Sequence, residues 1–281
     1  MEKQFWITIR ENNFAIPAGY SARELTEELF TYLGSTDPEL RDSIGLEAFY
    51  HWLTQGLYPA EDLHAYITRL LENLRKDTGK TGDDSVFLRS FSALWLSLIV
   101  QNDNATQGMK KDEFERIFEA ALVYFKEERD IRGYVLIKGY AHAIAHTSDL
   151  FAALADCRHV SAADQVRILD CIAEKMRDGK PGIYLYNEDS RIARAIQAIF
   201  ARDMLTLEQI KDWLASLSRD WNGAWQGEEG TRAYFNGRNL IRALYWYLLL
   251  GKGKDVPGKE AIMKLLQDTI EGARPWEWST T

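Results

Sequence analysis

Apolar positions recur along most of the chain with the spacing of amphipathic α-helices. In residues 57–74, "LYPAEDLHAYITRLLENL", the apolar residues Leu63, Ile67 and Leu70 share one face because they lie three or four positions apart. Pro59, with acidic residues just after it, marks the start of this segment, since proline fits the first helical turn and carboxylates favour its positive end. The pattern predicts a helix here.

The same period continues through the rest of the chain. It recurs in residues 81–100, 109–128, 161–176, 187–204, 206–218, 236–250 and 258–270. Alternation with a period of two is nearly absent, and only "QFWITI" at residues 4–9 is compatible with a short strand. The sequence therefore predicts an all-α protein of about ten to twelve helices joined by short polar turns.

Helices of similar length joined by short turns favour antiparallel pairs of neighbours. We expect these pairs to stack into an α/α superhelix, a degenerate HEAT-like solenoid, because no repeat of fixed length is visible. A compact bundle or an α/α toroid is the alternative. No linker divides the chain, so we expect one helical domain over residues 1–281.

Composition narrows the classes of partner. Hydrophobic residues make up 46% of the chain and charged residues 27%, as in soluble globular proteins. The net charge of −8 disfavours nucleic-acid binding, which needs clustered basic residues. The longest apolar runs have eight residues where a membrane span needs about 20, and the N-terminus lacks the apolar core of a signal peptide. We expect a cytoplasmic protein that binds neither nucleic acid nor membranes.

The segment "GYAHAIAHTSDL", residues 139–150, holds the most conspicuous chemistry. If residues 131–150 form one helix, Lys138, His142, His146 and Asp149 fall within a sector about 80° wide. Two histidines one turn apart can bind one metal ion, such as zinc or manganese, with Asp149 as a third ligand. The same stripe is also what an ordinary amphipathic helix presents to water. Ala143 replaces the glutamate of the HExxH motif, which disfavours zinc-protease chemistry.

Other polar residues are candidates for the same site. Asp130 and Arg132 precede the histidine segment, where a helix cap with a nearby ion pair is the simpler interpretation. Glu188 and Asp189 follow Asn187 and suit the first turn of a helix, but either could act as a general base. Arginines on apolar helices usually extend their charge to water or pair with a helix end, but they can also bind a carboxylate or phosphate. This class contains Arg89, Arg191 and Arg242, the last in a polar ridge with Asn239 and Tyr245.

Several segments together resemble one family of bacterial proteins, domain of unknown function 2785. The resemblance rests on "LGSTDPELRD" (33–42), "DSVFLRSFSAL" (84–94), "DIRGYVLIKGYAHAIAHTSDL" (130–150), "EDSRIARAI" (188–196) and "NLIRALYWYL" (239–248). Tyr140 departs from the Gly-Trp-Ala-His pattern of the family. The resemblance implies a helical intracellular protein and no particular activity. It marks seven positions as family motif residues: Arg132, His142, His146, Asp149, Glu188, Asp189 and Arg191.

Three functional hypotheses follow. The first is a binding module whose polar pocket is centred on His142, His146 and Asp149 and takes a small molecule or a protein; Arg89, Arg132, Lys138 and Arg191 would bind the ligand. The second is a hydrolase in which these three residues hold a divalent metal ion, and Glu188 or Asp189 activates water. The third is a structural scaffold in which the polar groups satisfy one another.

Overall fold

The part of the chain that the structure describes is mostly helical. The structure, a computed structural model, describes residues 1–222, 227–251 and 255–272. In those residues it contains twelve α-helices, one π-helix and a two-stranded hairpin, with 70% of residues helical and 2% in strands. This confirms the predicted all-α class. The chain divides into two compact units, Met1–Leu150 and Phe151–Thr281, while the single domain over residues 1–281 stays a prediction.

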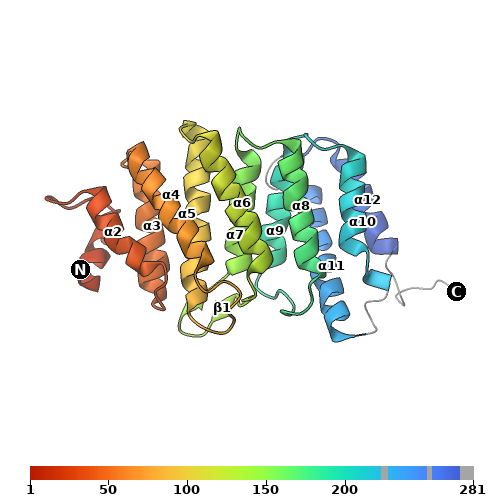
Figure 1. The fold of residues 1–281 in the computed structure, drawn as a ribbon, viewed down its shortest axis with the longest axis horizontal. Helices are drawn as coiled ribbons and strands as arrows, with labels where there is room; N and C mark the ends of the chain where they lie inside the picture. Colours follow the sequence, from red (N-terminus) through yellow and green to blue (C-terminus); the bar gives the residue numbers. More distant parts are fainter. Residues whose placement is uncertain (223–226, 252–254, 273–281) are drawn as a thin grey trace. The chain divides into compact units, whose positions relative to one another are not determined.

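The first unit contains seven helices, a hairpin and the start of an eighth helix. Its elements are α1 (Lys3–Glu11), α2 (Ala22–Tyr32), the π-helix η1 (Glu39–Leu46), α3 (Glu47–Thr54), α4 (Ala60–Arg75), α5 (Ser85–Thr106), α6 (Lys111–Glu127), β1 (Tyr134–Val135), β2 (Gly139–Tyr140) and the first part of α7 (Ala143–Asp156). Helix α5 packs along α4, and α6 also packs against α4 (Figure 1).

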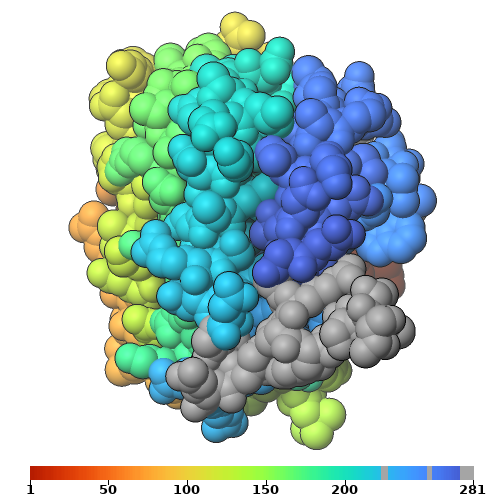
Figure 2. All heavy atoms as spheres, turned by 90° about the vertical axis from the view of Figure 1, so that its right-hand side faces the viewer, coloured from red at the N-terminus to blue at the C-terminus, as the bar shows by residue number. Residues whose placement is uncertain are grey.

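The second unit is a stack of helices. Its elements are the rest of α7, then α8 (Ala162–Arg177), α9 (Glu188–Ala201), α10 (Leu207–Ser218), α11 (Glu228–Leu249) and α12 (Lys259–Gly272). Helix α11 packs against α9 and α8, and α10 against α8. At the C-terminal end α12 covers α10 and α11 (Figure 2). Ser161 and Thr206 start α8 and α10 with capping boxes, in which side chain and backbone satisfy each other's hydrogen bonds.

Large aromatic rings fill the core of the first unit. The rings of Phe49 and Trp95 stack in parallel planes with centroids 4.0 Å apart, and both side chains are fully buried. Phe30 meets Trp95 edge-on at 5.2 Å, and Tyr66 lies 5.2 Å from Phe30. Rings of this size bury large apolar areas, which drives the packing of α3, α4 and α5 against one another.

Two predictions about local structure are wrong. Residues 4–9 form part of α1 and not a strand, because Trp6 and Ile9, three positions apart, are the side chains that become buried. Residues 131–150 are not one helix, because β1 and β2 form a hairpin and α7 begins only at Ala143. The glycine at 139 has φ of +78°, a conformation outside the helical region.

Two further findings concern membrane-spanning helices and the packing of neighbouring helices. No helix in the described part of the chain is both long and apolar enough to cross a membrane. Helices lie side by side within each unit, as the sequence predicts for neighbouring pairs. The superhelical arrangement stays a prediction.

Two buried tryptophans provide a matched test of this core. Trp52 donates a hydrogen bond from Nε1 to the Phe14 carbonyl at 2.8 Å, whereas Nε1 of Trp95 has no hydrogen-bond partner among the described residues. Trp52→Phe loses the bond and leaves a carbonyl unpaired, while Trp95→Phe removes a donor that was already unpaired. We expect the loss of unfolding free energy to be about 1–3 kcal/mol larger for Trp52→Phe. Urea denaturation measures both unfolding free energies. Equal losses in the two variants would show that the Trp52 hydrogen bond does not stabilise the fold.

Candidate functional site

The hairpin of residues 134–140 rests on a buried arginine. Arg41, in η1, is 1% exposed, and its guanidinium lies over the rings of Phe87 and Phe91 at 4.2 and 4.7 Å. It donates hydrogen bonds to the carbonyls of Ser35 at 2.6 Å and Lys138 at 2.8 Å. Burial lowers the pKa of the Arg41 guanidinium, and the neighbouring Asp42 partly offsets this. Arg41 thus joins η1, α5 and the hairpin.

Arg89, predicted as a ligand-binding residue, forms a fully buried ion pair with Glu128. Its Nε lies 2.7 Å from Oε2 of Glu128 and its Nη2 lies 3.2 Å from Oε1, a two-point contact between side chains that are both 0% exposed. Burial lowers the pKa of Arg89, but the hydrogen bonds and charge of Glu128 outweigh it and raise the pKa above its ordinary value. The guanidinium also donates to Oγ of Ser85 at 2.7 Å.

Two further ion pairs fix the segment that leads into the hairpin. Asp130 is 2% exposed, accepts hydrogen bonds from Arg132 at 2.7–3.0 Å and also takes the Gly82 N–H at 3.0 Å. The ion pair expected near Arg132 is therefore present. Lys138 contacts both carboxylate oxygens of Asp84 at 2.7 Å. These contacts give Arg132 and Lys138 structural partners within the first unit.

The two histidines occupy different environments. His142 precedes α7 with φ of +51°, is half-buried, and stacks on Tyr140 with ring centroids 4.4 Å apart. His146 is 6% exposed, and its Nδ1 lies 2.7 Å from Oγ of Ser90. The Ser90 hydroxyl donates its single hydrogen to the Ala141 carbonyl. This arrangement favours Nδ1 of His146 as the donor toward Ser90, that is, the Nδ1–H tautomer of the neutral ring.

A row of ring contacts runs from the hairpin surface into the core. Tyr134 meets Tyr140 edge-on at 5.2 Å, Tyr140 stacks on His142, His142 meets His146 at 5.9 Å, and His146 meets Phe91 at 5.0 Å. The row changes from 47% exposed at Tyr134 to fully buried at Phe91. Tyr140 of the hairpin is therefore two ring contacts away from the buried His146.

Two aliphatic side chains, Leu136 and Ile137, are exposed at the tip of the hairpin, and neither is among the site residues predicted from the sequence. Leu136 is 79% and Ile137 83% exposed. They are the central residues of a β-turn closed by the bond from the Lys138 N–H to the Val135 carbonyl at 3.0 Å. Ile137 has φ of +70°, a strained conformation for a β-branched residue. The glycines at 133 and 139, flanking an aromatic and aliphatic run, are the sequence signal for this hairpin.

The structure gives no support to a metal centre in the residues it describes. There, no group of three or more His, Cys, Asp or Glu side chains is placed to hold a metal ion. His146 and Asp149 do share a face of α7, and both are buried, at 6% and 8% exposed. Zinc or manganese bound by His142, His146 and Asp149 stays a prediction.

Three predicted site residues lie in the second unit, at the start of α9. Glu188 is 1% exposed and accepts the Tyr186 N–H on Oε2 at 2.7 Å; burial raises the pKa of this carboxyl, as a general base requires. Asp189 is half-buried and accepts the Ser190 N–H at 2.8 Å. Arg191 is half-buried on the same helix. Their catalytic and ligand-binding roles stay predictions.

Asp189 also lines a pocket of about 420 Å³ between α9 and α11. Asn239 and Arg242, from the polar ridge noted in the sequence, line the same pocket, together with Trp246, which is 57% exposed. The third member of the ridge, Tyr245, instead accepts a hydrogen bond from Gln267 at 2.9 Å. The pocket presents a carboxylate and a guanidinium to solvent, which suits a small polar ligand.

These features define a helical protein with a rigidly held surface hairpin and polar groups buried beneath it. The chain belongs to the family described as "Protein of unknown function (DUF2785)", whose model matches residues 74–246. The match includes the hairpin, both histidines and the start of α9, and it confirms the resemblance found in the sequence. No curated protein and no solved structure matches the chain.

The Arg89–Glu128 pair can be tested directly. Glu128→Gln leaves the Arg89 guanidinium buried without a counter-charge, so we expect a loss of about 3–5 kcal/mol of unfolding free energy. The neighbouring, exposed Glu127 is the control, and Glu127→Gln should change stability by no more than about 0.5 kcal/mol. Chemical denaturation of both variants measures the difference. Similar losses of stability in the two variants would show that the Arg89–Glu128 ion pair does not stabilise the fold.

Proposed function

We propose that the protein is a binding module that presents the tip of the 134–140 hairpin, with His142 behind it, to a protein partner. The main support for this proposal is that Leu136 and Ile137 are 79% and 83% exposed on a turn held in a strained conformation. Exposed aliphatic side chains on a rigid projection are typical of an interaction site. A cytoplasmic location, a bacterial source and a HEAT-like superhelix are parts of the same proposal.

The surroundings of the hairpin support a preorganised contact. Arg41 binds the Lys138 carbonyl from below, Lys138 is paired with Asp84, and the Cβ of any larger residue at Gly139 would lie 2.9 Å from Pro38. The loop is therefore held in one conformation before binding. A preformed loop loses less conformational entropy on association than a flexible one, which favours affinity. A projecting tip also suits a pocket on a partner better than it suits a small molecule.

Site-specific crosslinking tests this proposal. A photoreactive phenylalanine analogue in place of Leu136 should crosslink one partner in cells of the source organism, whereas the same analogue at Leu207, 47% exposed on α10, should not. The purified partner should then bind the chain, and Ile137→Ser should weaken binding about 10- to 150-fold, since burying one aliphatic side chain contributes about 1.5–3 kcal/mol. An affinity that Ile137→Ser leaves unchanged would overturn the proposal.

Metal analysis separates this function from the hydrolase hypothesis. If the histidines serve the hairpin and its packing, protein purified without an affinity tag should carry far less than one zinc or manganese ion per chain. His142→Ala should leave that content unchanged, because no ligand is lost. Elemental analysis by mass spectrometry measures it. Near-stoichiometric metal that disappears in His142→Ala would instead favour the hydrolase, with Glu188 or Asp189 as its base.

A further inference from the structure

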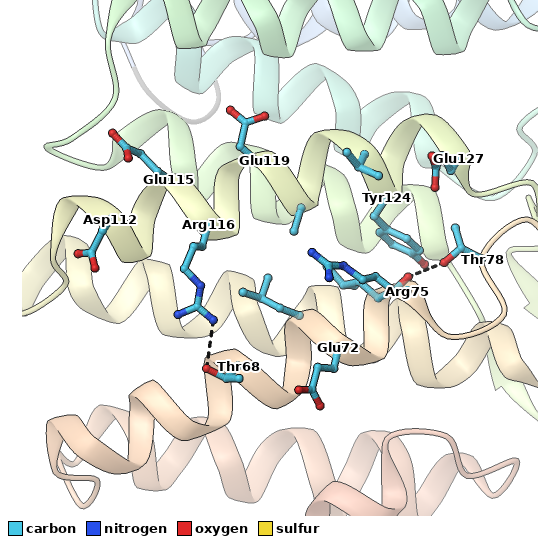
Figure 3. A pocket seen from close by; sticks show the side chains of 14 residues that line it. Thr68, Glu72, Arg75, Thr78, Asp112, Glu115, Arg116, Glu119, Tyr124 and Glu127 are labelled. Atoms are coloured by element: carbon cyan, nitrogen blue, oxygen red, sulfur yellow. Dashed lines mark hydrogen bonds between the residues drawn. The ribbon is translucent and has the colours of Figure 1, made fainter.

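A groove runs between α4 and α6 in the first unit, away from the hairpin tip. It has a volume of about 740 Å³ and is lined only by residues of these two helices and of the turn after α4. Figure 3 shows the two helices as its walls. On α6 the lining residues extend from Asp112 to Glu127, or about 24 Å of helix axis, enough for some four turns of a third helix; on α4 they extend from Thr68 to Arg75.

The floor of the groove is apolar. Leu71, Leu74 and Tyr124 are 7% or less exposed and form its base, and Ala120 is half-buried beside them. Val123 is 51% exposed, which is unusual for a valine on a helix whose neighbours pack well. An apolar strip along a groove between helices is the kind of surface onto which an amphipathic helix docks.

Charge is distributed unevenly around this floor. Five carboxylates line the groove against two guanidinium groups: Glu72, Asp112, Glu115, Glu119 and Glu127 against Arg75 and Arg116. Figure 3 shows the arginines between the two helices, Glu72 along the α4 edge, and Glu115 and Glu119 along the α6 edge. The acidic groups thus flank the groove, and the basic groups lie along its middle.

Several of these charged groups have no counter-ion among the residues that the structure describes. Among the described residues, Glu72, Asp112 and Glu127 form no ion pair, and neither does Arg75. Arg116 donates a hydrogen bond to Oγ1 of Thr68 at 3.2 Å, across the groove, rather than to a carboxylate. Like charges along both flanks repel one another unless a partner of opposite sign lies between them. The flanks therefore attract positively charged groups.

We propose that this groove binds an amphipathic helix of a partner protein, with apolar side chains on the floor and lysines or arginines along both flanks. Charge complementarity selects this occupant: two acidic edges match two basic edges, and an apolar face matches Val123 and Leu71. The arginines in the middle exclude a segment that is basic all around. The surface is distinct from the hairpin, so the two proposals stand or fall separately.

The test uses synthetic peptides and the full-length protein. The probe is an 18-residue fluorescein-labelled helix with leucines on one face and lysines on both borders of that face; the comparison peptide has glutamates in place of the lysines. Fluorescence anisotropy should give saturable binding of the lysine peptide and none of the glutamate peptide. Equal binding of both, or binding of neither, would overturn the proposal.

Two variants separate docking in the groove from general attraction to an acidic protein. The triple variant Glu72→Lys, Glu115→Lys and Glu127→Lys should weaken binding at least tenfold. The control triple variant Glu208→Lys, Asp212→Lys and Glu260→Lys makes the same change in net charge at exposed positions of the second unit and should have little effect. Equal weakening of peptide binding by the two triple variants would show that only net charge matters and would overturn the proposal that the peptide binds in the groove.

Val123→Asp gives the sharpest distinction. It adds a carboxylate to an acidic groove, so attraction by charge alone would strengthen binding of the lysine peptide, whereas docking on the apolar floor predicts at least tenfold weaker binding. Val123 is half-exposed, so the variant should fold, and circular dichroism checks this. Stronger binding by Val123→Asp, or displacement of the peptide by spermine at matched charge, would overturn the helix as occupant.

Discussion

The two-point contact between Arg89 and Glu128 is the constraint on which the proposed binding surface depends. It links the first turns of α5 to the residue that follows α6, with no part of either side chain exposed. Glu128 also accepts the backbone N–H groups of Arg129 and Asp130 at 2.9 Å, so the pair sets the direction in which the chain leaves α6. Such a pair is costly to bury and contributes geometry more than net stability.

Further polar contacts lie between the Arg89–Glu128 pair and the hairpin. Asp130 binds Arg132 and the Gly82 N–H, Lys138 binds Asp84, and Arg41 binds the Lys138 carbonyl. The contacts of Asp130 and Lys138 join residues 130–138 to the connection before α5, and the contact of Arg41 joins the hairpin to η1. Arg132 and Lys138, which the sequence marks as candidates for the site, thus also have ion-pair partners next to the hairpin. The scaffold and binding interpretations describe two aspects of one arrangement.

The helices were predictable because their apolar residues repeat at three and four positions over long stretches, as in α4. The hairpin was missed because Ala143, Ala145 and the histidines continue a plausible helical stripe toward the N-terminus, although Gly133 and Gly139 interrupt it. Partners such as Ser90 for His146 and Glu128 for Arg89 lie 56 and 39 positions away, so spacing could not reveal them. The groove combines side chains of two helices that only tertiary packing brings together, and no local pattern encodes it.

The close approach of Gly139 to Pro38 makes the residues allowed at these two distant positions depend on each other. A methyl group at position 139 would lie 2.9 Å from the Pro38 ring and 3.1 Å from the Arg41 guanidinium. A lineage that replaces the glycine must also reshape the turn before η1. Loss of the proline removes one part of the demand for glycine, while Arg41 and the positive φ at position 139 maintain the rest. These two positions are therefore expected to evolve as a pair, which makes their joint pattern among family members a record of whether the hairpin has been kept.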